Sequence, residues 1–514
     1  HMAEPALRSP FARAKLNGLK QVPSLSKVST NSKKTLYHWG GEDKIPSLVY
    51  VLKHANIELI SSSGRHLGVV TESDGVYTWG SGSSGQLGHG DKSSYPEPTH
   101  LEALSELAIS DIVCTAAQSA VITNTGDLYL WGWNGSDPVY KPKLMKPFNG
   151  TVAVTAVALG AFHVIVLGVS SGKKSVYSWG SNKHGQLAQG TSTTLRLDTP
   201  TIIESIPSDL VVSIASGEEC SCIITDAGEV YVWGNNANFA LGLNSSHDII
   251  FQPTLMEYFT NVQVSAIAYG ISFGLALLDC GILYSWGKNT DGQLGVGDLQ
   301  SRSVPVEITA LKEYSIIGIG CGNNNAAAWT DKGEVFCWGN NSKNRLGLGT
   351  DLPNVCIPTT LTALEGKLVH TVALGAETLA IVSVPTIDVV YENQVQKPIV
   401  TKTITMKELK QTICSYWKIK PEDMVLKSNG QFLSQNQHVI DSLTRGHSTI
   451  QVVDKTNAFM DDSHDIKFCF TSEDFPVPKA GTVEQLTKWL TNTEYPLDGY
   501  VRDFLLTYRA FTTP

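Results

Sequence analysis

The sequence lacks the features of a metalloenzyme, a disulfide-framed protein or a membrane-spanning protein. No apolar run among its 514 residues is long enough to cross a bilayer as a helix. The nine cysteines are scattered without a Cys-x-x-Cys pair, which favours buried free thiols in a reducing compartment. The thirteen histidines show no metal-ligand spacing, and no serine or cysteine has a recognisable nucleophile context. We therefore predict no catalytic residue, no metal and no cofactor.

Charge of either sign is also scarce, because only 17% of the residues are charged, which suits a compact β-rich body. The net charge is −9, so the whole molecule should repel nucleic acid and acidic membranes. Residues 1–34 are the exception, with seven Lys or Arg against one acid; they begin with His1-Met2, which resembles a cloning remnant. We expect a disordered basic extension here. The alternative is a localisation signal or an arm for an anionic surface, the one part through which membrane contact is expected.

What the sequence does contain is a repeat. Seven segments rich in β-branched and aromatic residues end on Trp-Gly, and such segments bounded by turn residues are typical of strands. Successive copies are 40 to 54 residues apart, a period that indicates a repeat architecture. The tryptophans are Trp39, Trp79, Trp131, Trp179, Trp233, Trp286 and Trp338.

The order of the pieces predicts how the repeats close. Six Gly-cornered apolar strands are each followed by a hairpin turn and a Trp-Gly strand. The first Trp-Gly strand, residues 36–40, has no such strand before it, and the last cornered strand, residues 371–382, has none after it. Pairing these two would seal a ring and remove its open edges. We predict an all-β fold, a seven-bladed β-propeller over residues 35–384 that is closed by strand exchange.

This pattern resembles the propeller family named for the regulator of chromosome condensation. The residues that carry the resemblance are the Trp-Gly strands, Gly-Gln-Leu-Gly loops such as residues 85–88, and Gly-x-x-His corners such as residues 160–163. In the nuclear exchange factor of that family, the corner loops contact the GTPase Ran through acidic and histidine side chains. The resemblance therefore implies these candidate partner-facing residues: Arg65, His66, His163, Glu218, Glu219, Asn324 and Glu377.

Departures from the family pattern keep other interpretations open. Only His66 and His163 keep the corner histidine, and the loop after Trp131 is too short to hold the wedge that the exchange factor inserts against its GTPase. Both points argue against Ran exchange. For the two histidines, a hydrogen-bonded corner residue is the alternative to a partner contact.

The repeat stops near residue 384, and the next segment has another pattern. Strands are expected at residues 387–391, 398–404, 424–427 and 449–453, with a helix that Thr405 and Glu408 would cap between the second and third. On its apolar face this helix would carry Leu409, Ile413 and Tyr416. This order of elements resembles a small ubiquitin-like β-grasp domain, assigned to residues 385–456.

Residues 457–514 are expected to end in a short helical segment. Thr482 and Gln485 form a capping box, and apolar residues of 500–508 recur at helical spacing. Residues 504–514 resemble the opening of the N-terminal motif of Ras-family guanine nucleotide exchange factors. Two helices are too few for an independent core, so residues 457–514 are interpreted as a truncated start of that motif.

Two phosphate-binding patterns are rejected on context. Residues 80–85 match Gly-x-Gly-x-x-Gly but lie between strands and open no helix. Residues 168–175 are one residue short of a phosphate loop and lie where other repeats turn, so a long turn is expected there.

Three functions remain open. The first is the regulatory, protein-interaction region of a multidomain Ras-family exchange factor, cytoplasmic or recruited to a membrane, and not an enzyme by itself. The second is a propeller that acts directly as an exchange factor for Ran or a related GTPase, with the nucleus as the alternative location. The third is a pure scaffold. All three place other proteins on a propeller face, and the first two add a Ras-superfamily GTPase as partner.

Overall fold

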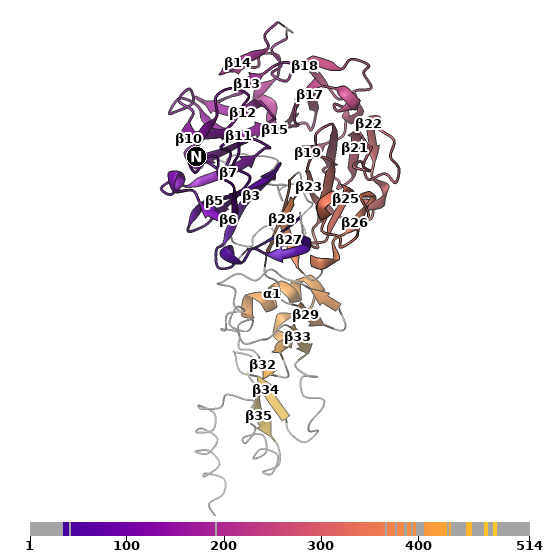
Figure 1. Cartoon of the computed structure of the whole chain (residues 1–514). Coiled ribbons are helices and arrows are strands. Elements are labelled where there is room, and N and C mark those ends of the chain that lie inside the picture. The colour runs from indigo at the N-terminus through magenta and orange to yellow at the C-terminus, as the bar shows by residue number, and fades with distance from the viewer. Residues whose placement is uncertain are drawn as a thin grey trace, which may run out of the picture. The chain divides into compact units, whose positions relative to one another are not determined.

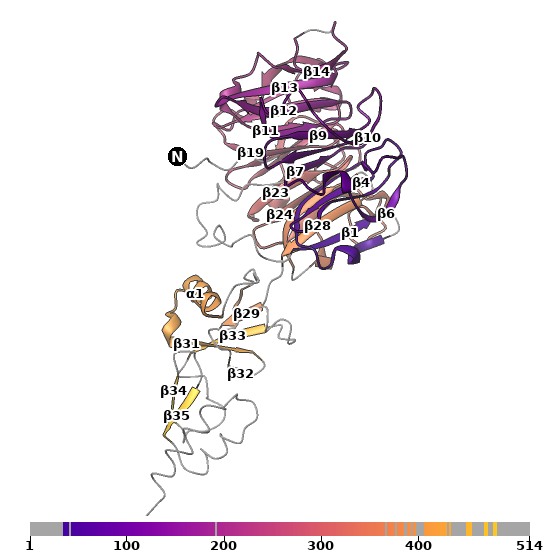
Figure 2. The ribbon, with the colours of Figure 1, turned by 90° about the vertical axis from the view of Figure 1, so that its left-hand side faces the viewer.

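Seven four-stranded antiparallel sheets form a ring in the computed structural model of the chain (Figure 1). The prediction of seven blades is confirmed. The innermost strands of neighbouring blades contact one another around the axis, and Figure 2 shows the same sheets from the side. The structure describes residues 34–40, 43–190, 193–364, 367–375, 378–384, 388–391, 394–396, 406–428, 431–432, 449–454, 467–470 and 476–480.

Each of the first six blades is one continuous stretch of chain, numbered here from its innermost strand outwards. Blade 1 contains β3 (Ile57–Ser63), β4 (His66–Thr71), β5 (Gly75–Gly80) and β6 (Tyr95–His100); blade 2 contains β7 (Ile109–Cys114), β8 (Gln118–Thr123), β9 (Leu128–Gly132) and β10 (Val139–Leu144); blade 3 contains β11 (Ala153–Leu159), β12 (His163–Ser170), β13 (Lys173–Ser181) and β14 (Arg196–Ile202).

Blades 4 to 6 repeat the same order. Blade 4 contains β15 (Val211–Ser216), β16 (Cys220–Thr225), β17 (Val230–Asn235) and β18 (Ile249–Leu255); blade 5 contains β19 (Val264–Tyr269), β20 (Phe273–Leu278), β21 (Leu283–Gly287) and β22 (Arg302–Glu307); blade 6 contains β23 (Ile316–Cys321), β24 (Asn325–Thr330), β25 (Val335–Asn340) and β26 (Asn354–Thr360).

Blade 7 is assembled from both ends of the propeller. Its inner strands are β27 (Leu368–Leu374) and β28 (Thr378–Val384), and its outer strands are β1 (Thr35–Gly40) and β2 (Asp43–Leu48). β1 pairs antiparallel with β28 without a bulge, from Thr35 opposite Ser383 to Gly40 opposite Thr378. The predicted closure by strand exchange is confirmed.

The glycine of each Trp-Gly pair is required by a close approach of two backbones. Gly80 has φ +102°, a conformation that favours glycine, and a Cβ at this position would collide with the carbonyl oxygen of Arg65 in the neighbouring strand corner. Gly180 has the same φ and meets the carbonyl of Phe162 in the same way. The motif therefore marks the point where the third strand of a blade passes under the corner between its first two strands.

In four blades the tryptophan of the pair joins the blade to the one before it. Trp131 Nε1 donates to the carbonyl oxygen of Gln86 at 2.7 Å, and Trp233 Nε1 donates to that of Gln186 at 2.9 Å. In both cases the acceptor lies in the loop between the third and fourth strands of the preceding blade. The Trp286–Ala240 and Trp338–Gln293 pairs repeat the bond at 2.9 Å. The indole thus fills the space between blades and carries a specific hydrogen bond across it.

Trp39 offers an internal comparison, because it is fully buried like Trp233 but its Nε1 has no hydrogen-bond partner among the described residues. Trp233→Phe should therefore destabilise the propeller more than Trp39→Phe does, by about 1 kcal/mol, since only the first change removes a buried hydrogen bond. Urea unfolding of both variants measures the difference. Equal losses would show that the indole hydrogen bond contributes nothing to blade association.

One-turn 3-10 helices form most of the turns between blades. Five of these turns each bury one apolar side chain under the ring: Leu52, Leu104, Phe259, Leu311 and Leu364. Those turns are η2 (Tyr50–Leu52), η3 (Glu102–Leu104), η6 (Glu257–Phe259), η7 (Thr309–Leu311) and η9 (Thr362–Leu364), and η4 (Ser208–Leu210) lies at the matching place after blade 3. Two further turns, η5 (Ala237–Phe239) and η8 (Ser342–Asn344), lie instead between the third and fourth strands of blades 4 and 6.

A second compact unit follows the propeller. Its mixed five-stranded sheet has the order β30-β29-β33-β31-β32, with β29 parallel to β33 and the other pairs antiparallel. Leu409, Ile413 and Cys414 of its helix are buried with Met424, Leu426 and Ile450 of the sheet. The elements are β29 (Asp388–Tyr391), β30 (Gln394–Gln396), α1 (Met406–Trp417), η10 (Pro421–Asp423), β31 (Met424–Ser428), β32 (Gln431–Phe432) and β33 (Thr449–Asp454).

The expected strand at 398–404, the side chain of Tyr416 and the helices expected after residue 481 lie outside the described residues. A hairpin of β34 (Lys467–Phe470) and β35 (Pro476–Ala480) follows the sheet, and the sequence did not predict it. Eight described cysteines are free thiols, six of them buried. Among the described residues, the helices are too short or too polar to span a membrane.

Candidate protein-binding face

Antiparallel strands alternate in direction, so two kinds of loop open on the same side of every blade. These are the corner between the first and second strands and the loop between the third and fourth strands. We call this side of the ring the corner face. Its described corners comprise residues 64–65, 115–117, 160–162, 217–219, 270–272 and 322–324, together with Gly375 in blade 7.

Hydrogen bonds link neighbouring corners. Gln118 Nε2 donates to the carbonyl of Ala161 at 3.0 Å, and the amide of Ala161 donates to the carbonyl of Glu218 at 2.8 Å. On the other side of the ring, the amide of Ile271 donates to the carbonyl of Asn323 at 3.0 Å. These bonds fix the spacing of the corner loops, so side chains on the face are presented from a rigid base.

His66 and His163 lie under the corner face at its blade interfaces, and both are fully buried. His66 Nε2 is 2.8 Å from the hydroxyl oxygen of Ser119 in the next blade, and that hydroxyl donates to the carbonyl of Gln86 at 2.9 Å. The same carbonyl accepts the Trp131 indole. Because serine has one proton to give and gives it to this carbonyl, Nε2 of His66 is the donor in its contact with the serine oxygen. His163 repeats the arrangement with Ser221 and Gln186, at 2.9 and 3.0 Å.

These contacts correct the expectation that the two histidines face a partner. Burial lowers the pKa of each imidazole to about 4, in His163 against the opposing effect of a backbone hydrogen bond with Cys220, and Nδ1 of His66 has no hydrogen-bond partner among the described residues. A charged ring would need a partner for that nitrogen. His66 and His163 are therefore the hydrogen-bonded corner residues that the sequence offered as the alternative, and they hold blades together.

Glu218 and Glu219 do lie on the surface of the face, at the corner of blade 4. Glu219 Oε2 accepts a hydrogen bond from Asn235 Nδ2 at 2.7 Å, and its Oε1 is 3.2 Å from Nδ1 of His184 in blade 3. Partial burial, and next the neighbouring Glu219 charge, raise the pKa of Glu218 above its usual value. Two adjacent carboxylates, of which that of Glu219 is held by Asn235, make this corner acidic.

The remaining candidates fall in two groups. Arg65 is exposed at the corner of blade 1, and Asn324 is half-buried at that of blade 6, where its carbonyl accepts the amide of Asn340 at 2.9 Å. Glu377 lies outside the described residues. The structure therefore leaves Arg65, Glu218, Glu219 and Asn324 as described candidates that a partner could touch.

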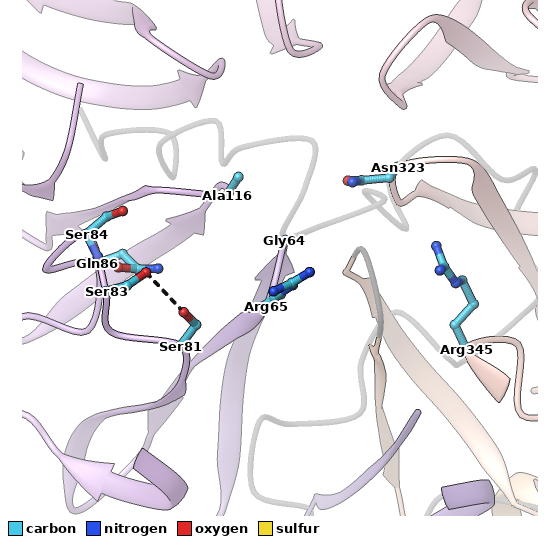
Figure 3. A pocket seen from close by; sticks show the side chains of 9 residues that line it. All are labelled: Gly64, Arg65, Ser81, Ser83, Ser84, Gln86, Ala116, Asn323 and Arg345. Atoms are coloured by element: carbon cyan, nitrogen blue, oxygen red, sulfur yellow. Dashed lines mark hydrogen bonds between the residues drawn. The ribbon is translucent and has the colours of Figure 1, made fainter. Parts of the chain in front are cut away.

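A cavity of about 370 Å³ opens on the corner face between blades 1 and 6 (Figure 3). Arg65 comes from the corner of blade 1, and Arg345 from the loop between the third and fourth strands of blade 6. Their side chains extend into the same space. The other lining residues among those that the structure describes are Gly64, Ser81, Ser83, Ser84, Gln86, Ala116 and Asn323.

Sequence reasoning missed Arg345 as a site residue, although a signal was present. It stands where three other repeats have glutamine, namely Gln86, Gln186 and Gln293. The loop that supplies Ser81 and Ser83 was considered only as a nucleotide fingerprint. It connects two strands and opens no helix, which is the context that the sequence indicated.

The second rejected pattern, residues 168–175, is a tight hairpin. β12 and β13 extend to a two-residue turn at Ser171 and Gly172, both with positive φ, so the expected long turn is wrong. In the parts of the chain that the structure describes, no group of three or more His, Cys, Asp or Glu side chains is placed to hold a metal ion.

The geometry defines a class of protein: a strand-exchanged seven-bladed propeller whose Trp-Gly strands and corner histidines bind successive blades together. Residues 28–381 match the RCC1-like domain family, and the chain belongs to that family. The family resemblance inferred from the repeat is thereby confirmed.

Curated relatives cover the same part of the chain. The serine/threonine-protein kinase Nek9 of Mus musculus is 29% identical over 374 residues, which are 66% of this chain and 37% of the relative. The ultraviolet-B receptor UVR8 of Arabidopsis thaliana is 30% identical over 335 residues, 63% of this chain and 74% of the receptor. The E3 ubiquitin-protein ligase HERC2 of Homo sapiens matches over only 6% of its own length. The chain thus spans about a third of Nek9 and a small part of HERC2.

Solved structures show the same fold. Prp20p from Saccharomyces cerevisiae superposes with a TM-score of 0.60 at 20% identity, covering 69% of this chain and 92% of Prp20p. Human WBSCR16 gives a TM-score of 0.60 at 21% identity, covering 68% of this chain and 98% of that structure.

Proposed function

We propose that the propeller recognises a small GTPase of the Ran type, or a close relative, through its corner face. The observation that carries this is the rigid ring of corner loops, which presents the paired carboxylates of Glu218 and Glu219 at one side of the ring in an RCC1-like propeller. Prp20p, which shares the fold, was described together with its binding properties to Gsp1p and histones. Carboxylates placed on a rim steer a basic partner surface during association.

Reversal of the acidic corner should weaken this complex. We expect E218K/E219K to lower the affinity for Ran about tenfold, mainly through a slower association rate, because complementary charge acts chiefly on the rate of encounter. The matched control is E102K/E257K, which makes the same charge change on the turns between blades, on the opposite side of the ring. Surface plasmon resonance with GDP-loaded Ran and Ras measures both.

A nucleotide-release assay then separates binding from exchange. Fluorescent GDP released from Ran faster in the presence of the chain, and more slowly with E218K/E219K, would support a propeller that is itself an exchange factor. Absence of binding to either GTPase, or equal loss with the control variant, would contradict recognition by the corner face.

A second candidate function rests on the chain after residue 384. We propose that residues 385–456 form a ubiquitin-like domain and that residues 457–514 begin a Ras-exchanger motif, so that the propeller regulates a Ras-family exchange factor. Support comes from the sheet order β30-β29-β33-β31-β32 with its parallel central pair, the arrangement of a β-grasp, and from the sequence of residues 504–514. On this proposal the chain binds a Ras-family GTPase without accelerating nucleotide release, and acceleration would contradict it.

A further inference from the structure

Two departures from the repeat meet in one cavity. At the corner position that Arg65 occupies, the other described blades have Ala117, Phe162, Glu219, Ser272 and Asn324, none of them basic. At the loop position of Arg345, the four other repeats that have this loop carry glutamine or Ala240. Both arginines therefore depart from the residue types that the other blades carry at these positions. Blades 1 and 6 are separated by blade 7 around the ring, yet both side chains line the same cavity.

The exchange of glutamine for arginine changes what this loop offers. Gln86 is buried, and its Oε1 accepts the amide of Ser84 at 2.8 Å, so its side chain serves its own loop. A guanidinium cannot accept a hydrogen bond. Arg345 donates instead from Nε to the carbonyl of Ser342 at 2.9 Å and from Nη2 to its hydroxyl at 2.7 Å. These bonds orient the planar group at the rim of the cavity.

The floor and wall of the cavity suit a polar ligand. Gly64 has φ +61°, and a Cβ there would lie 2.7 Å from Ala116 Cα, so the two small residues bring blades 1 and 2 together without filling the opening. Ser81 and Ser83 place their hydroxyl oxygens 3.4 Å apart on the wall (Figure 3). Hydroxyl donors and two guanidinium groups around one space match the oxygens of an anion.

We propose that this cavity receives an acidic side chain, a carboxylate or a phosphorylated residue, from a segment of a protein partner. A volume of about 370 Å³ is within the range of sites for a side chain with its neighbouring backbone. Nucleic acid and anionic membranes are disfavoured, because the chain carries a net charge of −9 and the same face presents Glu218 and Glu219. This proposal shares only the corner face with the proposed function. A partner on that face would meet both the basic cavity and the acidic corner of Glu218 and Glu219.

The test uses the full chain and a fluorescein-labelled peptide of six glutamates flanked by Gly-Ser, measured by fluorescence polarisation at 50 mM NaCl. R65E and R345E should each weaken binding at least tenfold. K183E is the matched control, since Lys183 is exposed and occupies in blade 3 the loop position that Ser83 occupies in blade 1. It should change the affinity less than twofold. Ala116→Trp tests the cavity by volume and should also abolish binding; thermal melting confirms that each variant is folded.

Each outcome decides. Wild-type binding by R65E and R345E, or an equal loss with K183E, overturns the proposal, because attraction would then be unspecific. Inorganic phosphate at millimolar concentration that raises the melting temperature of the wild type but not of R65E or R345E, while the peptide fails to bind, would also overturn it in favour of a free anion. Arginine-dependent peptide binding without GTPase binding would support this site and contradict only the proposed GTPase recognition.

Discussion

Removal of residues 1–49 should leave the propeller unable to fold stably at 25 °C. The deletion takes away β1 and β2, and with them Leu36 and Trp39, which are 1% and 0% exposed. Loss of two such side chains costs roughly 2–5 kcal/mol each. The loss of β1 also exposes the edge of β28 along six paired residues. Native proteins are stable by only about 5–15 kcal/mol, so the combined loss is of the same size as the whole stability.

Thermal unfolding followed by near-ultraviolet circular dichroism tests this expectation, with the deletion of residues 1–33 as the control. The control keeps β1 and should melt within about 2 °C of the full chain, since it removes none of the blade 7 pairs. A cooperative transition of the 1–49 deletion near the wild-type temperature would show that three-stranded blade 7 suffices, and that strand exchange is dispensable for closure.

The sequence was sufficient to predict the ring because every repeat needs the same few residues for its own backbone. Only glycine fits at position 80, under the Arg65 carbonyl. At position 131 a large apolar side chain with an N–H group is needed to reach the carbonyl of Gln86. The need for glycine recurs in six blades and the tryptophan bond in four, so both appear as a period. Closure was predictable because the repeat left one strand without a partner at each end, residues 36–40 and residues 371–382.

What could not be predicted depends on contacts between blades. His66 and Ser119 are 53 residues apart, and neither local sequence indicates that the serine hydroxyl accepts a hydrogen bond from the imidazole. The cavity has the same origin, since Arg65 and Arg345 are 280 positions apart and meet only because the ring closes. Residues that repeat thus proved to be structural, and the two arginines that break the repeat mark the candidate site.

A fall in pH should lower the stability of the propeller through its buried histidines, His66 and His163. His66 and His163 have folded-state pKa values lowered to about 4, against about 6.5 for histidine in the unfolded chain. A group with a lowered pKa in the folded state stabilises it above the unfolded pKa, and that contribution declines as the pH falls from 6.5 toward 4. At pH 5 each histidine should have lost about 2 kcal/mol of its contribution, from a full value of about 3 kcal/mol.

The variant H66Q/H163Q isolates this effect, because blade 2 already carries a buried glutamine, Gln118, at the matching position. It should be less stable than wild type at pH 7 by about 1–3 kcal/mol per site, yet lose about 4 kcal/mol less than wild type between pH 7 and pH 5. Urea unfolding at both pH values measures the difference. The control H54Q/H247Q, which changes two exposed histidines, should lose as much stability between pH 7 and pH 5 as the wild type does. If the wild type and H66Q/H163Q lose the same stability, the two imidazoles are not held neutral between the blades.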